Sequence, residues 1–246
     1  MVDYPFYLIY QFSLQTRLYV KMIFIMTLQI VLASNSPRRR QMLAWLDLPF
    51  TVTSADIDET PLPGENPANY VMRLAREKAR ACERETSFGG VILAADTTVA
   101  DGDEILGKPV DAQDALRILR QLRGRTHKVH TAIVVGVPSR GLTKYELCTT
   151  EVKMRRYSDQ EMQDYVQRGD PLDKAGAYAI QDELFNPVEK ISGCYASVMG
   201  LPLCHFERAL RQLGFGARKG VPYRCMRELA YTCPIFKRVL AGEDVG

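Results

Sequence analysis

The chain has 246 residues, of which 46% are hydrophobic and 25% are charged. This composition is typical of a globular protein and excludes a disordered or fibrous chain. Lys and Arg number 32 against 29 Asp and Glu, so the formal net charge is only +3. Because so small an excess gives no basic coat, the total charge does not demand nucleic acid as a partner.

The cysteines indicate a reduced protein. A chain of this length does not need disulfides for stability, and none of the cysteines has the C-x-x-C spacing of a metal or redox motif. We therefore predict free thiols and a cytoplasmic location. The six residues are Cys82, Cys148, Cys194, Cys204, Cys225 and Cys233.

The first 25 residues are interpreted as an apolar N-terminal extension, distinct from the domain that follows. The acidic Asp3 and the interrupting Arg17 and Lys21 disagree with a signal peptide, and the run of about 20 apolar residues that spans a membrane is missing. No membrane partner is expected. Met22 and Met26 both precede a strand pattern, so we predict that the native protein begins at one of them.

Strand and helix patterns alternate from residue 26 to residue 214, which predicts one α/β domain with a sheet covered by helices. Strands are predicted at Gln29–Ser34, Phe50–Ser54, Val91–Val99, Val129–Val137 and Tyr145–Arg155, with shorter ones at Tyr178–Ile180 and Val188–Ile191. Helices are predicted at Pro37–Asp47, Pro67–Glu85, Ala112–Leu122, Asp159–Arg168 and Leu203–Leu213. Residues 215–246 form a tail of unassigned role, with one or two short helical patterns between Tyr223 and Ala241.

A basic helix start follows the first predicted strand. Ser36 is a favourable N-cap and Pro37 a favourable first helical residue, yet three arginines, residues 38–40, fill the turn where acidic residues are preferred. A bound phosphate would resolve this conflict, because backbone N–H groups, the hydroxyls of Ser34 and Ser36 and the guanidinium groups converge there. A solvated basic turn is the alternative.

Lys78 falls on the apolar stripe of the helix predicted at Pro67–Glu85. It lies four residues after Leu74 and seven after Val71, so it points towards the core side. Either its ammonium snorkels to the margin of the core or it reaches into a cleft.

Acidic residues follow two of the predicted strands. The apolar run at Val91–Ala95 is typical of a strand buried on both faces, and it ends in Asp96, where an acid is placed for ligand chemistry. A buried carboxylate requires a nearby cation. Lys108 can be presented by the Gly107–Pro109 turn, and Asp58 and Glu59 form a second acidic group, which is either functional or merely solvated.

These groups together suit the hydrolysis of a nucleoside triphosphate, with cations for the phosphates and carboxylates for a divalent ion or a water. The chain has neither a Walker loop nor a G-x-G-x-x-G motif, so P-loop and Rossmann binding are not supported. A metal site of His127 and His130 is the weaker alternative, because the two side chains would point to opposite faces of a strand. His127 is interpreted as a hydrogen-bonded structural residue.

The motifs resemble those of the Maf (septum formation) nucleotide pyrophosphatases. The matching blocks occur in order over about residues 28–213. They are Leu32–Arg39, Arg76–Ala79, Ala95–Thr97, Gly107–Pro109, Leu172–Tyr178 and Gly200–Pro202. The resemblance implies the inosine triphosphate pyrophosphatase (Maf/Ham1-like) fold, a mixed twisted sheet flanked by helices with a deep cleft. It also implies cleavage of nucleoside triphosphates between the α and β phosphates.

The resemblance also implies roles for individual residues. Asp96 would be the proton acceptor that activates water, while Lys78, Lys108 and Arg38 or Arg39 would hold the triphosphate. Asp58, Glu59 and Asp96 would bind Mg²⁺ or Mn²⁺. The substrate-specificity positions are Arg38, Thr97 and Gln181, and this combination resembles the branch that acts on dTTP and UTP. The residues after Gln181 depart from the family pattern, which puts the shape of that loop in question.

Two other functions stay open at this point. One is a nucleotide-binding regulator of cell division that needs no catalysis, and the other is a pyrophosphatase of the 7-methyl-GTP type. An RNA-binding module is not favoured, because no aromatic residues are interleaved with the arginines. The expected partner is a nucleoside triphosphate, including modified nucleotides, and the resemblance leaves a homodimer open.

Overall fold

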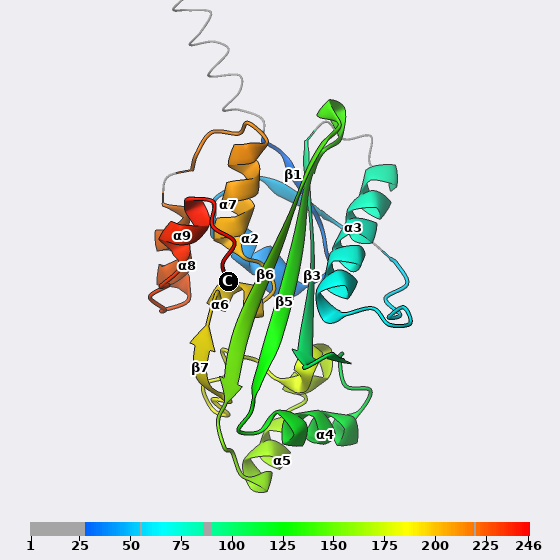
Figure 1. Cartoon of the computed structure of the whole chain (residues 1–246), viewed down its shortest axis with the longest axis vertical. Helices are drawn as coiled ribbons and strands as arrows, with labels where there is room; N and C mark the ends of the chain where they lie inside the picture. Colours follow the sequence, from blue (N-terminus) through cyan, green and yellow to red (C-terminus); the bar gives the residue numbers. More distant parts are fainter. Residues whose placement is uncertain (1–27, 55, 86–89, 219) are drawn as a thin grey trace, which may run out of the picture.

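The computed structural model describes residues 28–54, 56–85, 90–218 and 220–246. The predicted N-terminal extension and both candidate start sites lie outside these residues. Within them, seven strands form one mixed sheet in the order β2-β1-β3-β5-β6-β7, with the short β4 also paired to β3. Helices cover both faces of the sheet (Figure 1). The predicted α/β class, with a mixed sheet flanked by helices, is confirmed.

The elements follow the predicted order along the chain. The strands are β1 Ile30–Ala33, β2 Phe50–Thr53, β3 Val91–Asp101, β4 Glu104–Leu106, β5 Thr126–Val137, β6 Leu142–Met154 and β7 Val188–Ser192. The α-helices are α2 Pro37–Ala44, α3 Pro67–Glu85, α4 Ala112–Leu122, α5 Asp159–Gln167, α6 Tyr195–Val198, α7 Leu203–Gln212, α8 Val221–Glu228 and α9 Phe236–Leu240. In this part of the chain, no helix has both the length and the apolar character to span a membrane.

Three strands connect two lobes. In Figure 1 the β5–β6 hairpin runs along most of the molecule beside β3, with α3 on one side and α7 on the other. Around one half of these strands, α3 packs on one face of the sheet through Val71 and Ala75, while α2 and α7 pack on the opposite face through Leu43 and Phe206. Around the other half, α4 and α5 enclose a separate apolar core that includes Ile118.

The sequence underestimates the long strands and misplaces one short strand. β5 begins at Thr126 and β6 at Leu142, in both cases three residues earlier than predicted, because polar residues alternate there and weaken the apolar signal. The strand predicted at Tyr178–Ile180 is wrong. This segment follows a 3₁₀ turn at Ala175–Ala177. Tyr178 is buried in the apolar core beside α4 and α5, and its hydroxyl lies 2.8 Å from Nε2 of His127.

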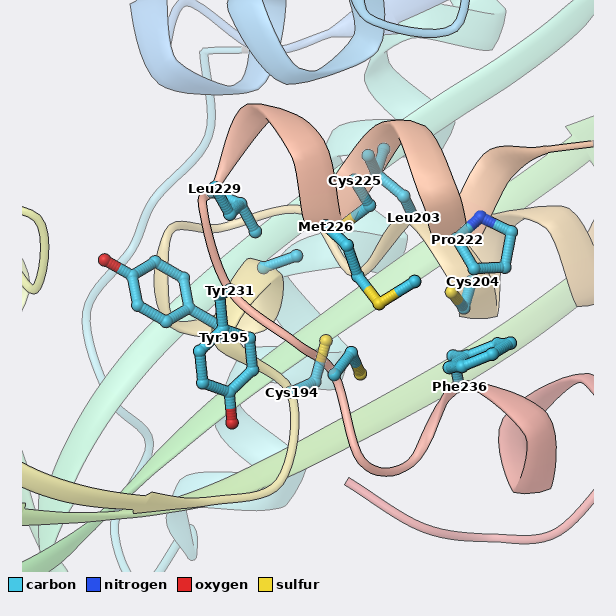
Figure 2. A pocket seen from close by; sticks show the side chains of 12 residues that line it. Cys194, Tyr195, Leu203, Cys204, Pro222, Cys225, Met226, Leu229, Tyr231 and Phe236 are labelled. Atoms are coloured by element: carbon cyan, nitrogen blue, oxygen red, sulfur yellow. The ribbon is translucent and has the colours of Figure 1, made fainter.

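The tail packs against the body through its two short helices. Figure 2 shows the pocket that α8 shares with the body, where Cys225 and Met226 of the tail lie near Cys194 and Cys204. The cavity measures only about 20 Å³, which is room for about one water molecule. The chain then returns to the sheet, where the amide of Thr149 in β6 donates to the Gly246 carbonyl at 2.5 Å. The tail therefore packs as part of the domain.

Candidate active site

A large cleft opens where one edge of β3 lacks a partner strand. β1 pairs with β3 only as far as Ala94, and β4 pairs with the same edge from Val99 onward. Among the described strands, none covers the edge of residues 95–98 between these two partners. The cleft of about 630 Å³ opens there, between the two lobes. Asp96 therefore lies in the middle of an 11-residue strand rather than at its carboxyl end.

This cleft brings together almost all of the predicted site residues. Those that line it are Ser34, Ser36, Arg38, Arg39, Glu59, Lys78, Asp96, Thr97, Lys108 and Gln181. Asp58 is placed differently: its carboxylate accepts a hydrogen bond from the Thr60 amide at 2.9 Å, and the residue is not part of the cleft lining. The neighbouring Asp56 does line the cleft.

Lys78 reaches the cleft from α3 and joins two carboxylates. Its Nζ lies 2.6 Å from Oδ1 of Asp96 and 2.6 Å from Oε1 of Glu59. Lys78 and Asp96 are buried, with 9% and 7% of their surfaces exposed. The alternative that Lys78 snorkels at the core margin is wrong, because the ammonium enters the cleft and pairs there. The cation that a buried Asp96 requires is therefore Lys78.

Burial controls the charge state of Asp96. Desolvation raises the pKa of Asp96 above its ordinary value, although the charges of Lys78 and Arg39 oppose the shift. Glu59 behaves in the opposite way: partial burial acts to raise its pKa, but the Lys78 hydrogen bond and the surrounding cations lower it overall. The cleft thus holds one carboxylate that binds a proton more readily than usual beside one that stays ionised. Such a separation is typical of acid–base sites.

Tyr70 on α3 holds the loop that carries Glu59. Its hydroxyl donates to the Glu59 carbonyl at 2.8 Å, and Tyr70 also lines the cleft. Burial, followed by the charges of Asp96 and Glu59, raises the pKa of Tyr70 to about 12, so the hydroxyl remains a donor. Sequence analysis missed this residue. Its position on the buried face of the helix, two turns before Lys78, is the signal that could have indicated it.

The basic helix start separates its three arginines. The Ser36 side chain caps α2 by accepting from the Arg39 amide at 3.4 Å. Arg39 turns inward and Arg38 stays at the cleft rim, where its Nη1 is 3.8 Å from Oδ2 of Asp173. Arg40 is exposed. The predicted cap and helix start are confirmed, and two of the arginines reach the cleft.

Arg39 is fixed by hydrogen bonds from three segments. Its Nε donates to the Gly200 carbonyl at 2.9 Å, its Nη1 to Ser34 Oγ at 3.2 Å and its Nη2 to Thr97 Oγ1 at 3.1 Å. Gly200 has φ +111°, and a Cβ there would lie 3.3 Å from Arg39 Nε, so glycine suits both the backbone and the close approach. Desolvation lowers the pKa of Arg39, partly offset by Asp96.

The unusual loop after Gln181 folds away from the cleft. Asp182 accepts from the Phe185 amide at 2.7 Å and from Nη2 of Arg168 at 3.0 Å. The Phe185 ring stacks on Tyr165 with centroids 4.3 Å apart. Gln181 lines the cleft, whereas the segment 182–187 does not. The residues that depart from the family pattern therefore anchor the loop, and Gln181 is the residue of this segment that lines the cleft.

The cleft carboxylates fit a divalent ion only in part. Among the residues that the structure describes, no three His, Cys, Asp or Glu side chains converge as a metal site. Asp96 and Glu59 converge on Lys78, and two carboxylates completed by substrate phosphates are a normal set for Mg²⁺. His127 and His130 instead bond to Tyr178 and Thr149, which confirms the structural interpretation of His127.

The fold and the cleft define an α/β protein that presents several cations and one buried carboxylate to a small anionic ligand. The chain belongs to the Maf family, since the family model described as "Maf-like protein" matches residues 29–213. The tail lies outside this match.

Two relatives cover most of this chain. A dTTP/UTP pyrophosphatase of Anaeromyxobacter dehalogenans (strain 2CP-1 / ATCC BAA-258) is 49% identical over 189 residues, which are 76% of this chain and 95% of that protein. A dTTP/UTP pyrophosphatase of Myxococcus xanthus (strain DK1622) is 50% identical over 186 residues, which are 75% of this chain and 92% of that protein. The solved Ham1 protein of Staphylococcus aureus aligns over 52% of this chain and 72% of its own, with a TM-score of 0.38 and 17% identity.

Proposed function

We propose that this protein hydrolyses dTTP and UTP between the α and β phosphates, to the nucleoside monophosphate and pyrophosphate. The observation that carries the proposal is the buried Asp96 carboxylate, paired with Lys78 on the floor of a basic cleft. The names of the two relatives supply the substrate class.

Asp96 is the proton acceptor in this proposal. A water beside its carboxylate would lose a proton as it attacks the α-phosphorus, and the raised pKa makes Asp96 a stronger base than an exposed aspartate. The base must be ionised, so the rate falls as pH falls through the pKa of Asp96. Lys78 keeps the carboxylate oriented through the 2.6 Å contact with Oδ1.

The cations bind the triphosphate and stabilise the departing pyrophosphate. Arg39 is fixed by three segments, whereas Arg38 and Lys108 line the cleft from opposite lobes, so the three can contact different phosphates. The hydroxyls of Ser34 and Ser36 belong to the same phosphate-binding loop. Thr97 and Gln181 are the remaining specificity residues with Arg38.

Asp96 and Glu59 would hold a Mg²⁺ or Mn²⁺ ion together with phosphate oxygens. When bound, the ion would neutralise phosphate charge and polarise the α-phosphoryl group. Asp58 stays a candidate only if the Asp58–Thr60 turn opens. We place the reaction in a reduced, cytoplasmic setting, in keeping with the free thiols of Cys148, Cys194, Cys204, Cys225 and Cys233. The same hydrolysis would clear modified nucleotides.

Pyrophosphate release from dTTP and UTP with Mg²⁺ tests the proposal. The wild type should turn over both, and Asp96→Asn should lose the activity while Asp101→Asn, on the same strand and outside the cleft lining, retains it. A panel with CTP, GTP and 7-methyl-GTP ranks the substrates, and preference for 7-methyl-GTP would contradict the dTTP/UTP assignment. Tight binding of dTTP without turnover by the wild type would instead indicate a nucleotide-binding regulator.

A further inference from the structure

A buried hydroxyl lies directly behind Thr97. Thr131 on β5 is the register partner of Thr97 on β3, and the two Oγ1 atoms are 3.0 Å apart. Thr131 is completely buried. It is not part of the cleft lining.

The direction of the hydrogen bond between the two threonines follows from their other partners. Thr131 Oγ1 donates its one proton to the Ser197 carbonyl, at 2.7 Å, since a carbonyl can only accept. Thr131 can then only accept from Thr97, so the Thr97 hydroxyl must be the donor. The chain of bonds runs from Arg39 through Thr97 and Thr131 to the Ser197 carbonyl.

This direction fixes what Thr97 can offer to a ligand. Its proton is given to Thr131 and one lone pair accepts from Nη2 of Arg39, which leaves a single lone pair. Thr97 therefore presents an acceptor, and never a donor, to the cleft. The triphosphate oxygens are themselves acceptors at neutral pH, so they cannot hydrogen-bond to Thr97. On dTTP and UTP, the donors shared by both are the ring N3–H and the sugar 3′-hydroxyl.

We propose that Thr131 is a positioning residue that holds Thr97 as an acceptor for a donor on the nucleoside half of the substrate. The inference deepens the proposed function and rests on it. Arg39 and Thr97 then have different roles. Arg39 attracts phosphate, and Thr97 accepts a hydrogen bond from the base or sugar. Without Thr131, the Thr97 hydroxyl can rotate and donate, and the discrimination against nucleotides without that donor falls.

Three variants separate this role from ordinary stability. Thr131→Val removes the hydroxyl at nearly constant volume, whereas Thr131→Ser retains it. Thr150→Val is the matched control, because Thr150 is equally buried on β6 and bonds to Ser197 Oγ at 2.8 Å, without contact to Thr97 or Arg39 in the described structure. Both valine variants should lower the melting temperature to a similar extent.

Binding is measured by calorimetry with α,β-imido analogues, which cannot be cleaved at the reacting bond, of dTTP, 3-methyl-dTTP and 3′-deoxy-dTTP. The wild type should lose about tenfold in affinity for the analogue that lacks the donor read by Thr97, the effect of one hydrogen bond. The two modified analogues distinguish the ring N3–H from the sugar hydroxyl. In Thr131→Val this tenfold penalty should disappear, and in Thr131→Ser and Thr150→Val it should persist.

Equal binding of all three analogues by the wild type would overturn the inference. An unchanged penalty in Thr131→Val would also overturn it, even if that variant were less stable. Turnover of dTTP by the wild type is recorded separately. If dTTP is hydrolysed but the penalty does not depend on Thr131, the inference fails while the proposed function stands. If dTTP is bound but never hydrolysed, the proposed function fails first.

Discussion

Two buried ion pairs, one in the cleft and one under the tail, have similar burial but very different surroundings. Lys78 and Asp96 are 9% and 7% exposed, and Arg208 and Glu146 are 8% and 7% exposed. The Arg208 guanidinium donates to both carboxylate oxygens of Glu146, and its Nη1 donates to the Val239 and Glu243 carbonyls of the tail. Its hydrogen-bonding groups are therefore used internally.

The cleft pair retains capacity for a ligand. The three donors of Lys78 serve two carboxylates, Asp96 and Glu59, and the ammonium borders a cleft of about 630 Å³. Arg208, by contrast, is enclosed by the tail. Burial and charge alone therefore do not mark an active site. The pair proposed to be catalytic borders an open cavity, whereas the hydrogen-bonding groups of the pair under the tail are all used internally.

Of the two buried ion pairs, the cleft pair should affect activity more, and we expect a large loss of activity for Lys78→Met. Removing the ammonium leaves Asp96 and Glu59 facing each other and takes one cation from the triphosphate. We expect kcat/KM for dTTP to fall about 10³-fold, or about 4 kcal/mol of transition-state stabilisation, by steady-state pyrophosphate release. Arg80→Met, on the exposed side of the same helix, should retain activity. Loss of activity in both variants would contradict a special role for Lys78.

Glu146→Gln should act on stability instead. It leaves the buried Arg208 charge without its carboxylate, and removing one partner of such a pair costs about 3 to 4 kcal/mol. Urea unfolding should show this loss, while the folded fraction at 25 °C turns over dTTP at the wild-type rate. The double variant Glu146→Leu with Arg208→Met should regain much of the stability. A kcat loss larger than tenfold in folded Glu146→Gln would remove the distinction between the two pairs.

Each region also contains a buried histidine whose pKa lies far below its ordinary value. His127 bonds to Tyr178 below the cleft, and His205 bonds to the Val245 carbonyl of the tail. Burial lowers the pKa of each to about 4, from an ordinary value of 6.5. Between pH 4 and pH 6.5, each of these histidines binds a proton in the unfolded chain but not in the folded protein. Stability therefore rises with pH in this range and is lost on acidification.

Between pH 6.5 and pH 4, each histidine should lower the free energy of unfolding by about 3 kcal/mol. Urea titrations at a series of pH values measure how the free energy of unfolding changes with pH. His127→Gln and His205→Gln should each remove about half of the pH dependence that the two histidines cause together. An unchanged slope in both variants would show that other groups cause the acid sensitivity. A change in only one would locate the sensitivity in the cleft lobe or at the tail.

The smallest effect is expected at an exposed pair. Lys153 and Glu189 are 2.6 Å apart, but their side chains are 44% and 49% exposed. Because water solvates both groups, Lys153→Ala should change the unfolding free energy by less than about 0.5 kcal/mol and leave kcat unchanged. A loss of stability comparable with that of Glu146→Gln would show that burial does not control how much these ion pairs contribute to stability.

The sequence predicts the chemistry of the cleft better than its architecture. Asp96, Lys78 and the basic helix start lie in local patterns that contradict ordinary burial or capping preferences, so they can be found without a structure. The gap between β1 and β4 cannot, because it depends on where neighbouring strands end. Thr131 was missed for the same reason: only the register of β5 against β3 places it behind Thr97.

The tail shows the same limit. Its short helices are indicated by pattern, but the clamp between Arg208 and the carbonyls of Val239 and Glu243 joins positions more than 30 residues apart. Such contacts have no local signal. The incorrect strand at Tyr178–Ile180 is the converse case: its apolar residues resemble a buried strand, but the segment packs without strand pairing, and the Tyr178 hydroxyl bonds to His127.

Single-turnover hydrolysis of dTTP in H₂¹⁸O shows whether water attacks the α-phosphorus with the help of Asp96. Attack of an Asp96-activated water on the α-phosphorus places one ¹⁸O atom in dTMP and none in pyrophosphate, and Asp96→Asn should form neither product at a measurable rate. Mass spectrometry of both products reads the result. Label in the pyrophosphate, or labelled dTMP formed by Asp96→Asn at the wild-type rate, would contradict attack on the α-phosphorus by a water that Asp96 activates.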